Sequence, residues 1–147
     1  MSTRRILPAI ALPLLFAILG DQSARSDPQG DTSIDVPVTH LQFYQDREGL
    51  TVANAWGNPA NGAHSNFIKI PANTASPLHT HTQSYYGVVI TGVVVNQPAT
   101  DGPDEPLMPG SYWYQKGGEP HVTKCISPTE CLIFVTSKGS FDFLVVK

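Results

Sequence analysis

The sequence predicts an all-β protein, a sandwich or barrel built from short antiparallel strands. Glycine and proline are frequent, with 12 and 13 residues in a chain of 147. They divide the chain into short segments rich in β-branched and aromatic residues, as in folds of many strands. No segment has the apolar spacing of a helix over three turns, and no repeat period is visible. The length suits one domain with a core of its own.

The first residues have the pattern of an export signal. Arg4 and Arg5 form a positive start, residues 6–19 are apolar apart from two prolines, and residues 23–26 supply small side chains for cleavage. The apolar run is shorter than the roughly 20 residues of a membrane-spanning helix, although an uncleaved anchor is the alternative. We therefore predict a cleaved signal over 1–26 and a periplasmic or secreted protein. The arginine pair partly matches a twin-arginine signal, so the export route stays open.

The polar residues 27–36 are predicted to form a flexible leader, and 37–147 the folded domain. Eight strands are expected there, each rich in Val, Ile, Phe, Tyr, Trp or Thr and bounded by Gly, Pro, Asn, Asp or Ser. In chain order they are 38–44 after Pro37, 50–56 between Gly49 and Gly57, 66–70 before Pro71, 85–96 after Ser84, 111–115 after Gly110, 121–126 after Pro120, 132–136 after the turn at 127–130, and 141–146 after Ser140.

The aromatic residues of these strands are expected mostly in the core or lining the barrel, because aromatics on strands are more often packing residues than cofactor contacts. They include Trp56, Trp113, Tyr112, Tyr114, Phe67, Phe134, Phe141 and Phe143.

The charge distribution argues against nucleic acid as a partner. The formal net charge is −3, and the longest basic cluster is Arg4-Arg5. Signal cleavage removes three of nine basic and one of twelve acidic residues, which leaves six against eleven. Proteins that neutralise phosphates need clustered Lys and Arg. We expect a small-molecule ligand, and no membrane contact after cleavage.

Two histidines one residue apart form the most informative pattern. His79 and His81 would point to the same face of an extended strand, because side chains alternate with a period of two. They could therefore converge on one cation, although such pairs also occur by chance on solvated strands. A third histidine, His121, follows downstream, whereas His40 and His64 fit no such pattern and are expected at the surface.

The spacing around these histidines resembles the first motif of the cupin superfamily, which is Gly, five residues, His-x-His, three or four residues, Glu, six residues, Gly. Here Ala72 or Asn73 stands near the first Gly position, three residues follow His81, Tyr85 replaces Glu, and Gly92 closes the motif. The spacing holds, but the carboxylate is missing.

The second cupin motif is Gly, five residues, Pro-x-Gly, two residues, His, three residues, Asn. This chain has Gly110, then Lys116-Gly117-Gly118, His121 and Cys125 at those spacings. Lys116 therefore replaces Pro and Cys125 replaces Asn. Two motifs in register are stronger evidence than either one alone.

The resemblance implies a single jelly-roll barrel of two antiparallel sheets with a metal in its mouth. More narrowly, residues 50–146 look like an uncharacterised single-domain cupin family, similar to the cupin domain of ChrR-type anti-sigma factors. Because the superfamily hosts dioxygenases, isomerases, lyases, storage proteins and sensors, it implies the fold far more than the function. Cupin barrels often pair through their edges, so a homodimer is an option.

On this basis His79, His81 and His121 are the predicted ligands of one divalent metal ion, with iron, zinc or manganese left open. The alternative is a barrel that has kept the histidines without a metal. Tyr85, at the carboxylate position, could act in catalysis, bind a ferric ion as phenolate, or simply fill the mouth. Glu119, close to His121, could act as a base or orient a ligand, or could be only a turn residue.

Cys125 and Cys131 flank a short turn, and in an exported protein this favours a disulfide. The alternative is a free Cys125 thiolate near the metal, since Cys125 has the strand parity of His121.

Two functions follow as hypotheses. The first is a metal-dependent, dioxygenase-like enzyme acting on a small oxygen-rich or dicarbonyl molecule. The second is a metal-dependent binding or sensing domain without turnover.

Overall fold

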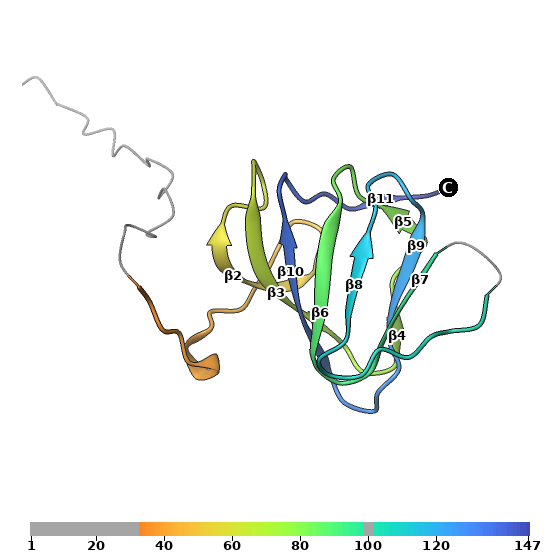
Figure 1. The fold of residues 1–147 in the computed structure, drawn as a ribbon, viewed down its shortest axis with the longest axis horizontal. Coiled ribbons are helices and arrows are strands. Elements are labelled where there is room, and N and C mark those ends of the chain that lie inside the picture. The colour runs from red at the N-terminus through yellow and green to blue at the C-terminus, as the bar shows by residue number, and fades with distance from the viewer. Residues whose placement is uncertain (1–32, 99–101) are drawn as a thin grey trace, which may run out of the picture.

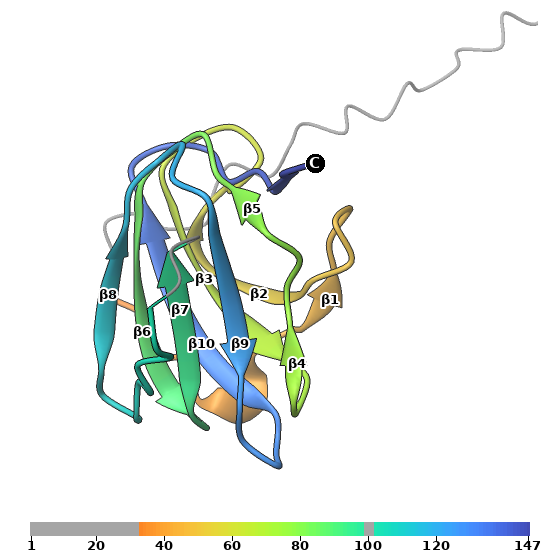
Figure 2. The ribbon, with the colours of Figure 1, turned by 90° about the vertical axis from the view of Figure 1, so that its right-hand side faces the viewer.

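The computed structural model describes residues 33–98 and 102–147, and these form two facing antiparallel sheets (Figures 1 and 2). The predicted all-β, jelly-roll class is confirmed. The predicted export signal at 1–26 and most of the leader at 27–36 lie outside the described residues. Within the described ranges, no helix is both long and apolar enough to cross a membrane.

The larger sheet has six strands in the order β1-β2-β3-β10-β6-β8. Its long central strands pair in register, with Ile133 of β10 opposite Ile68 of β3 and Val89 of β6. The strands are β1 (Tyr44–Gln45), β2 (Thr51–Gly57), β3 (His64–Ile70), β6 (Tyr85–Thr91), β8 (Tyr112–Gln115) and β10 (Cys131–Ser137).

The smaller sheet has five strands, and β9 (His121–Cys125) lies at its centre. One side of β9 pairs with β7 (Val94–Pro98), and the other pairs with β4 (Thr74–Ala75) and β5 (His79–Thr80). The last strand, β11 (Leu144–Val145), pairs with β5. In Figure 2 the ends of β5 and β11 and the start of β9 lie together at one end of the barrel, which is its mouth.

The core lies between the sheets and consists mainly of inward-facing aliphatic residues. Burial of apolar surface stabilises such a core by about 25 cal/mol for each Å² removed from water, and it is the main stabilising contribution. Its buried members include Val52, Ile68, Val89, Val94, Trp113, Ile133 and Val135.

Several expected strands differ from those observed. The segment expected at 38–44 forms a 3-10 helix, Val38–His40, before the short β1. The strand expected over 85–96 is two strands in different sheets, because the chain turns at Gly92 with a φ of 81°. Of 141–146, only residues 144–145 are strand, and the short β4 and β5 were not among the expected eight.

The turns that set the motif spacing explain two of its residues. Gly92 adopts the left-handed φ that glycine tolerates at no steric cost. Asn73, near the first Gly of the motif, has a φ of 53°, and Asn is among the few other residues that adopt this conformation readily. Asn73 therefore takes the left-handed conformation here without being a glycine.

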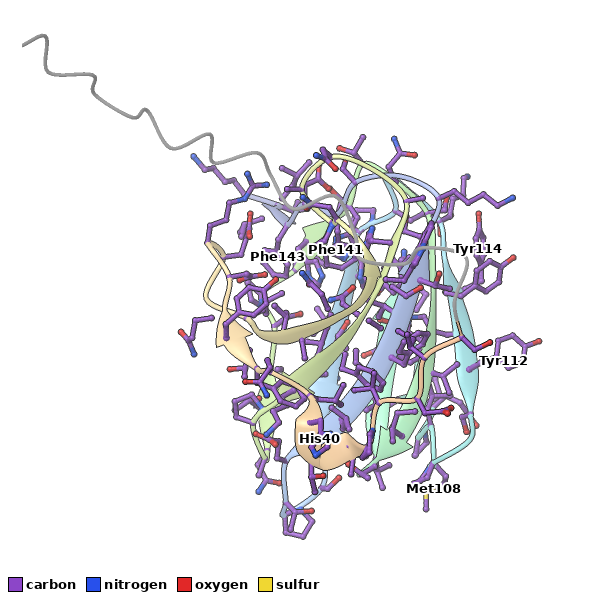
Figure 3. The ribbon with its side chains drawn as sticks, turned by 90° about the vertical axis from the view of Figure 1, so that its left-hand side faces the viewer. His40, Met108, Tyr112, Tyr114, Phe141 and Phe143 are labelled. Carbon is purple, nitrogen blue, oxygen red and sulfur yellow. A yellow bond between two sulfur atoms is a disulfide. The ribbon has the colours of Figure 1, made fainter. Side chains whose placement is uncertain are left out.

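Some expected burial was wrong. Tyr112 and Tyr114 are 71% and 54% exposed and point away from the barrel (Figure 3), because the alternation of β8 turns Trp113 inward instead. Trp56 is 43% exposed next to a register shift in β2. His64, expected at the surface, is fully buried. It lies on the inward face of β3, and its Nδ1 is 3.0 Å from the carbonyl oxygens of both Gly62 and Gly139.

Candidate metal centre

The three predicted ligand histidines come together at the barrel mouth. His79 is on β5, His81 follows the end of that strand, and His121 begins β9, where it pairs directly with His79. One ring nitrogen from each lies within 4.8 Å of the other two. The side chains are buried, with exposures of 2%, 3% and 0% for His79, His81 and His121.

Backbone carbonyl groups orient all three rings. Nδ1 of His79 donates to the Pro77 carbonyl oxygen at 2.9 Å, and Nδ1 of His121 donates to that of Glu119 at 3.1 Å. Nδ1 of His81 donates to the Asp142 carbonyl oxygen. Because a carbonyl oxygen can only accept, each Nδ1 carries the proton and each Nε2 keeps its lone pair. Metal-binding histidines typically have such a partner on the second nitrogen.

The surroundings of these rings keep them neutral. Burial lowers the pKa of His79 to about 4, with nearby His121 and His81 adding to the effect against the Pro77 carbonyl. Burial likewise lowers the pKa of His81 to about 4, against the Asp142 hydrogen bond. It also lowers the pKa of His121, against the carbonyl and charge of Glu119. Three neutral imidazoles are the donor set that a divalent metal needs. The residues present therefore fit such an ion.

A segment near the C-terminal end packs over the histidines, and no motif in the sequence marks it as part of the site. We call residues 141–143 the strap. The Phe143 ring stacks on His79, with centroids 4.0 Å apart and planes 20° from parallel. The Phe141 ring lies 4.3 Å from that of His81. The alternation of Phe141 and Phe143 was the available signal, but it reads equally well as an ordinary strand.

Asp142 fastens the strap to the chain after His81. Its carboxylate accepts hydrogen bonds from Thr82 N at 2.7 Å and from Thr82 Oγ1 at 2.6 Å. Partial burial raises the pKa of this carboxyl, but the Thr82 hydrogen bonds and nearby His81 outweigh that effect, so the pKa is lowered. Asp142 is therefore ionised at neutral pH and holds the strap in place.

Tyr85 lies beside the histidines. Its side chain is 4% exposed, and its hydroxyl is 3.4 Å from Nε2 of His121 and 3.4 Å from Nε1 of Trp113. Burial raises the pKa of Tyr85 to about 12, against hydrogen bonds with Trp113 and Thr123. Tyr85 without a bound metal is thus a neutral phenol at ordinary pH.

Glu119 contributes its backbone rather than its carboxylate. Its carbonyl oxygen holds His121, whereas the side chain is 57% exposed and lies 3.8 Å from Nζ of Lys116. The carboxylate is therefore at the surface beside Lys116, and it acts on His121 through its charge.

Cys125 and Cys131 form a disulfide with a Cα–Cα distance of 5.8 Å, and both are buried. Both cysteines of the chain are thereby paired, so this geometry offers no thiolate to a metal.

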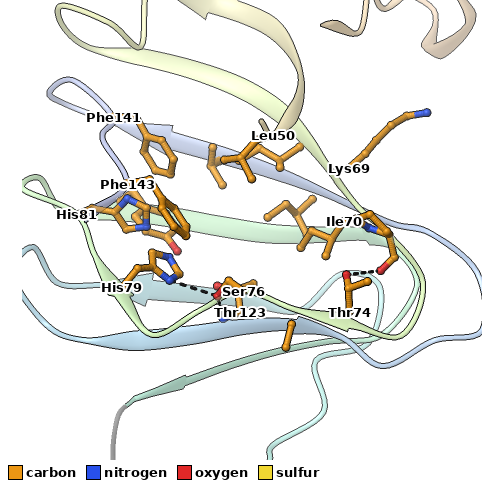
Figure 4. Close-up of a pocket in the computed structure, with 16 residues that line it drawn as sticks. Leu50, Lys69, Ile70, Thr74, Ser76, His79, His81, Thr123, Phe141 and Phe143 are labelled. Atoms are coloured by element: carbon orange, nitrogen blue, oxygen red, sulfur yellow. Dashed lines mark hydrogen bonds between the residues drawn. The ribbon is translucent and has the colours of Figure 1, made fainter. Parts of the chain in front are cut away.

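A cavity of about 220 Å³ opens next to the histidines. Figure 4 shows His79, His81 and the strap phenylalanines at one end, with Leu50, Ile70 and Thr74 toward the other. His79, His81 and Tyr85 line this cavity, so a ligand in it reaches the histidine cluster from that side.

Comparisons with known proteins agree with this fold. The family described as "Domain of unknown function (DUF4437)" matches residues 38–144. A comparison with curated protein sequences found no match.

Among solved structures, the polyketide cyclase RemF from Streptomyces resistomycificus is similar, with 19% identity and a TM-score of 0.65 over 79% of this chain and 87% of that one. A cupin-like protein of unknown function from Ralstonia eutropha JMP134 has 19% identity and a TM-score of 0.62 over 78% of each chain. The DMSP lyase DddQ from Ruegeria pomeroyi DSS-3 has 14% identity and a TM-score of 0.55, over 76% of this chain and 59% of that one. Likeness at this level of identity establishes the cupin fold and nothing about activity.

Proposed function

Since this chain belongs to the DUF4437 family and has a cupin fold, we propose that it binds one divalent metal ion through His79, His81 and His121 and acts on a small carbonyl or dicarbonyl molecule. One observation carries the proposal. All three buried rings donate Nδ1–H to a backbone carbonyl, so that their lone pairs remain for a common ion.

The metal would supply a Lewis-acidic centre with positions open to a small molecule or to dioxygen. The protein's own residues do the rest. Phe141 and Phe143 shield the cluster from water on the strap side. The Tyr85 hydroxyl, protonated and next to His121, can donate a hydrogen bond to an oxygen of a molecule in the cavity. The cyclase and the DMSP lyase among the structural neighbours support an enzymatic role only at the level of fold.

A second candidate is metal-dependent binding without turnover, and the cavity wall favours it. Among the described residues that line the cavity, Lys69 is the only one with a charged side chain, since the histidines are neutral. Its Nζ pairs with Glu130 at 3.1 Å, and the side chain points away from the cavity (Figure 4). Apart from Lys69 and the histidines, Tyr85 is then the only titratable side chain among the described residues that line the cavity.

Metal analysis and calorimetry test the proposal. Purified protein should contain about one equivalent of metal and rebind zinc or iron after chelation. His121→Ala should lose this binding, whereas His40→Ala, which changes an exposed histidine outside the cluster, should keep it. Equal affinity of both variants would refute the metal site.

Oxygen uptake separates the two candidates. Iron-loaded protein with acetylacetone as the dicarbonyl probe should consume oxygen if the dioxygenase-like hypothesis holds, and the zinc-loaded protein should not. Tight metal binding, with no change in acetylacetone or in a panel of related carbonyl compounds under any metal, would favour the binding function.

We also propose that the protein is exported after cleavage near residue 26. The disulfide supports this location, because disulfides persist in oxidising compartments. N-terminal sequencing of protein from the periplasmic or culture fraction should begin near Asp27, and full-length protein confined to the cytoplasm would contradict the proposal.

A further inference from the structure

The wall of the histidine cavity restricts which molecules it can hold. Apart from His79, His81 and Tyr85, most of its lining is aliphatic or aromatic. These residues are Leu50, Ile68, Ile70, Pro71, Ala75, Ile133, Val135, Phe141 and Phe143. Most of the body of a ligand would therefore contact carbon.

The two threonine hydroxyl groups of the wall already donate within the protein, and the Ser76 oxygen already accepts. Thr74 Oγ1 donates to the Pro71 carbonyl oxygen at 2.7 Å, and Thr123 Oγ1 donates to Asn96 Oδ1 at 2.8 Å. Ser76 Oγ accepts from Thr123 N at 3.0 Å and lies 3.2 Å from His79 Nδ1. A ligand with many hydroxyl groups would lose its hydrogen bonds to water and find few replacements here.

A charged group on the body of the ligand would also lack a partner. Lys69 is held outside the cavity by Glu130 and by the Phe43 ring, whose centroid is 4.4 Å from Lys69 Nζ. Burial of an unpaired charge is costly. Only the histidine end can receive a strongly polar group.

We propose that the ligand has one head group, which chelates the metal through oxygen atoms, and an uncharged, apolar body. This body lies along the wall from His79 to Ile70. This excludes sugars and polyhydroxy acids and keeps dicarbonyl or enol compounds with hydrocarbon substituents. The inference rests on the proposed function, since the metal holds the head.

A homologous series of hydroxamates tests the inference on zinc-loaded protein. Acetohydroxamate, hexanohydroxamate and octanohydroxamate share one chelating head, so their differences in affinity report on the wall. Calorimetry should find affinity rising about fourfold for each methylene buried, from the usual transfer free energy of that group, until the cavity is full. Gluconohydroxamate, with the carbon count of hexanohydroxamate but hydroxyls along its chain, should bind no better than acetohydroxamate. Zinc content is measured after each titration, so that metal removal is not mistaken for binding.

A matched pair of variants locates the effect. Ile70→Thr makes the far wall more polar and should reduce the gain in affinity with chain length. Ile90→Thr, the same change at a 41% exposed position outside the cavity, should leave that gain unchanged. If the unmodified protein does not bind zinc, the proposed function itself is overturned. Normal zinc and acetohydroxamate binding without a gain in affinity with chain length, or stronger binding of gluconohydroxamate, would overturn only the apolar-body inference.

Discussion

Gly87 is a position where the structure leaves no room for a side chain. It lies in β6, with Val135 of β10 on one side and Trp113 of β8 on the other. A Cβ at Gly87 would lie under 3.0 Å from three atoms of the Trp113 indole, Cζ2, Cε2 and Cη2. Gly87→Ala therefore forces Trp113 or the strand to move.

The expected loss follows from the contacts of Trp113. Overpacking a core by one methyl group costs about 1–3 kcal/mol. Displacement of the indole also disturbs its edge-to-face contact with Tyr85, at a centroid distance of 6.3 Å, which adds about 1 kcal/mol. The lower chain entropy of alanine returns at most about 1 kcal/mol. We expect the free energy of unfolding to fall by about 2–3 kcal/mol and Tm by about 10 °C.

Urea titration followed by tryptophan fluorescence and circular dichroism measures this loss. Gly62→Ala is the matched control, because a Cβ there would have no atom within 4 Å, and it should change stability by less than about 0.5 kcal/mol. Trp113→Leu removes the clashing ring, so the double variant should be more stable than the sum of the two single changes predicts. Equal stability of Gly87→Ala and Gly62→Ala, or strict additivity with Trp113→Leu, would refute the packing argument.

Three further predictions concern the site and its supports. Because burial lowers the pKa of His79 and His81 to about 4, the unfolded state binds more protons below pH 6.5, so metal-free protein should lose stability as the pH falls from about 6.5 to 4. A variant with Gln at both positions should have a flatter profile, and a parallel profile would contradict the argument. Replacing Cys125 and Cys131 by Ala should cost about 2 kcal/mol in urea titrations, the chain-entropy value for so short a loop, with zinc affinity unchanged; a weaker zinc affinity would tie the disulfide to the site. Phe143→Ala should weaken zinc binding about tenfold or more in calorimetry, because His79 loses the ring that fixes its orientation. A zinc affinity equal to that of the wild type would show that the strap does not position His79.

The sequence was sufficient for the fold class and for the clustering of the histidines. The fold class follows from strand composition between turn residues, and the clustering was implied by the resemblance of both motifs to those of cupins. His79 and His121 are far apart in the chain, yet the motif register predicted that they meet, and they pair across β5 and β9. The bound metal remains a prediction.

The parts that failed depend on tertiary packing. Nothing local distinguishes a buried His64 from a surface histidine, since its burial comes from the inward face of β3 and from Gly139, which is remote in sequence. Phe141 and Phe143 line the cavity, as expected of barrel-lining aromatics, but their contact with the histidines was not predicted, because they have the composition of an ordinary strand. The sheet change at Gly92 divides an apolar run that is otherwise continuous, so composition predicts one long strand there.

The use of carbonyl oxygens to orient the three histidines affects how the protein can change in evolution. Every residue type carries a backbone carbonyl, so substitutions at residues 77, 119 and 142 leave the acceptors of the His79, His121 and His81 protons in place while the backbone path persists. Side chains around the mouth can therefore diverge, altering what the cavity admits, without changing the tautomer of any histidine. The carbonyl acceptors themselves are therefore vulnerable mainly to insertions or deletions that shift the chain near those positions, whereas the strap contacts of Asp142 and Phe143 depend on side chains.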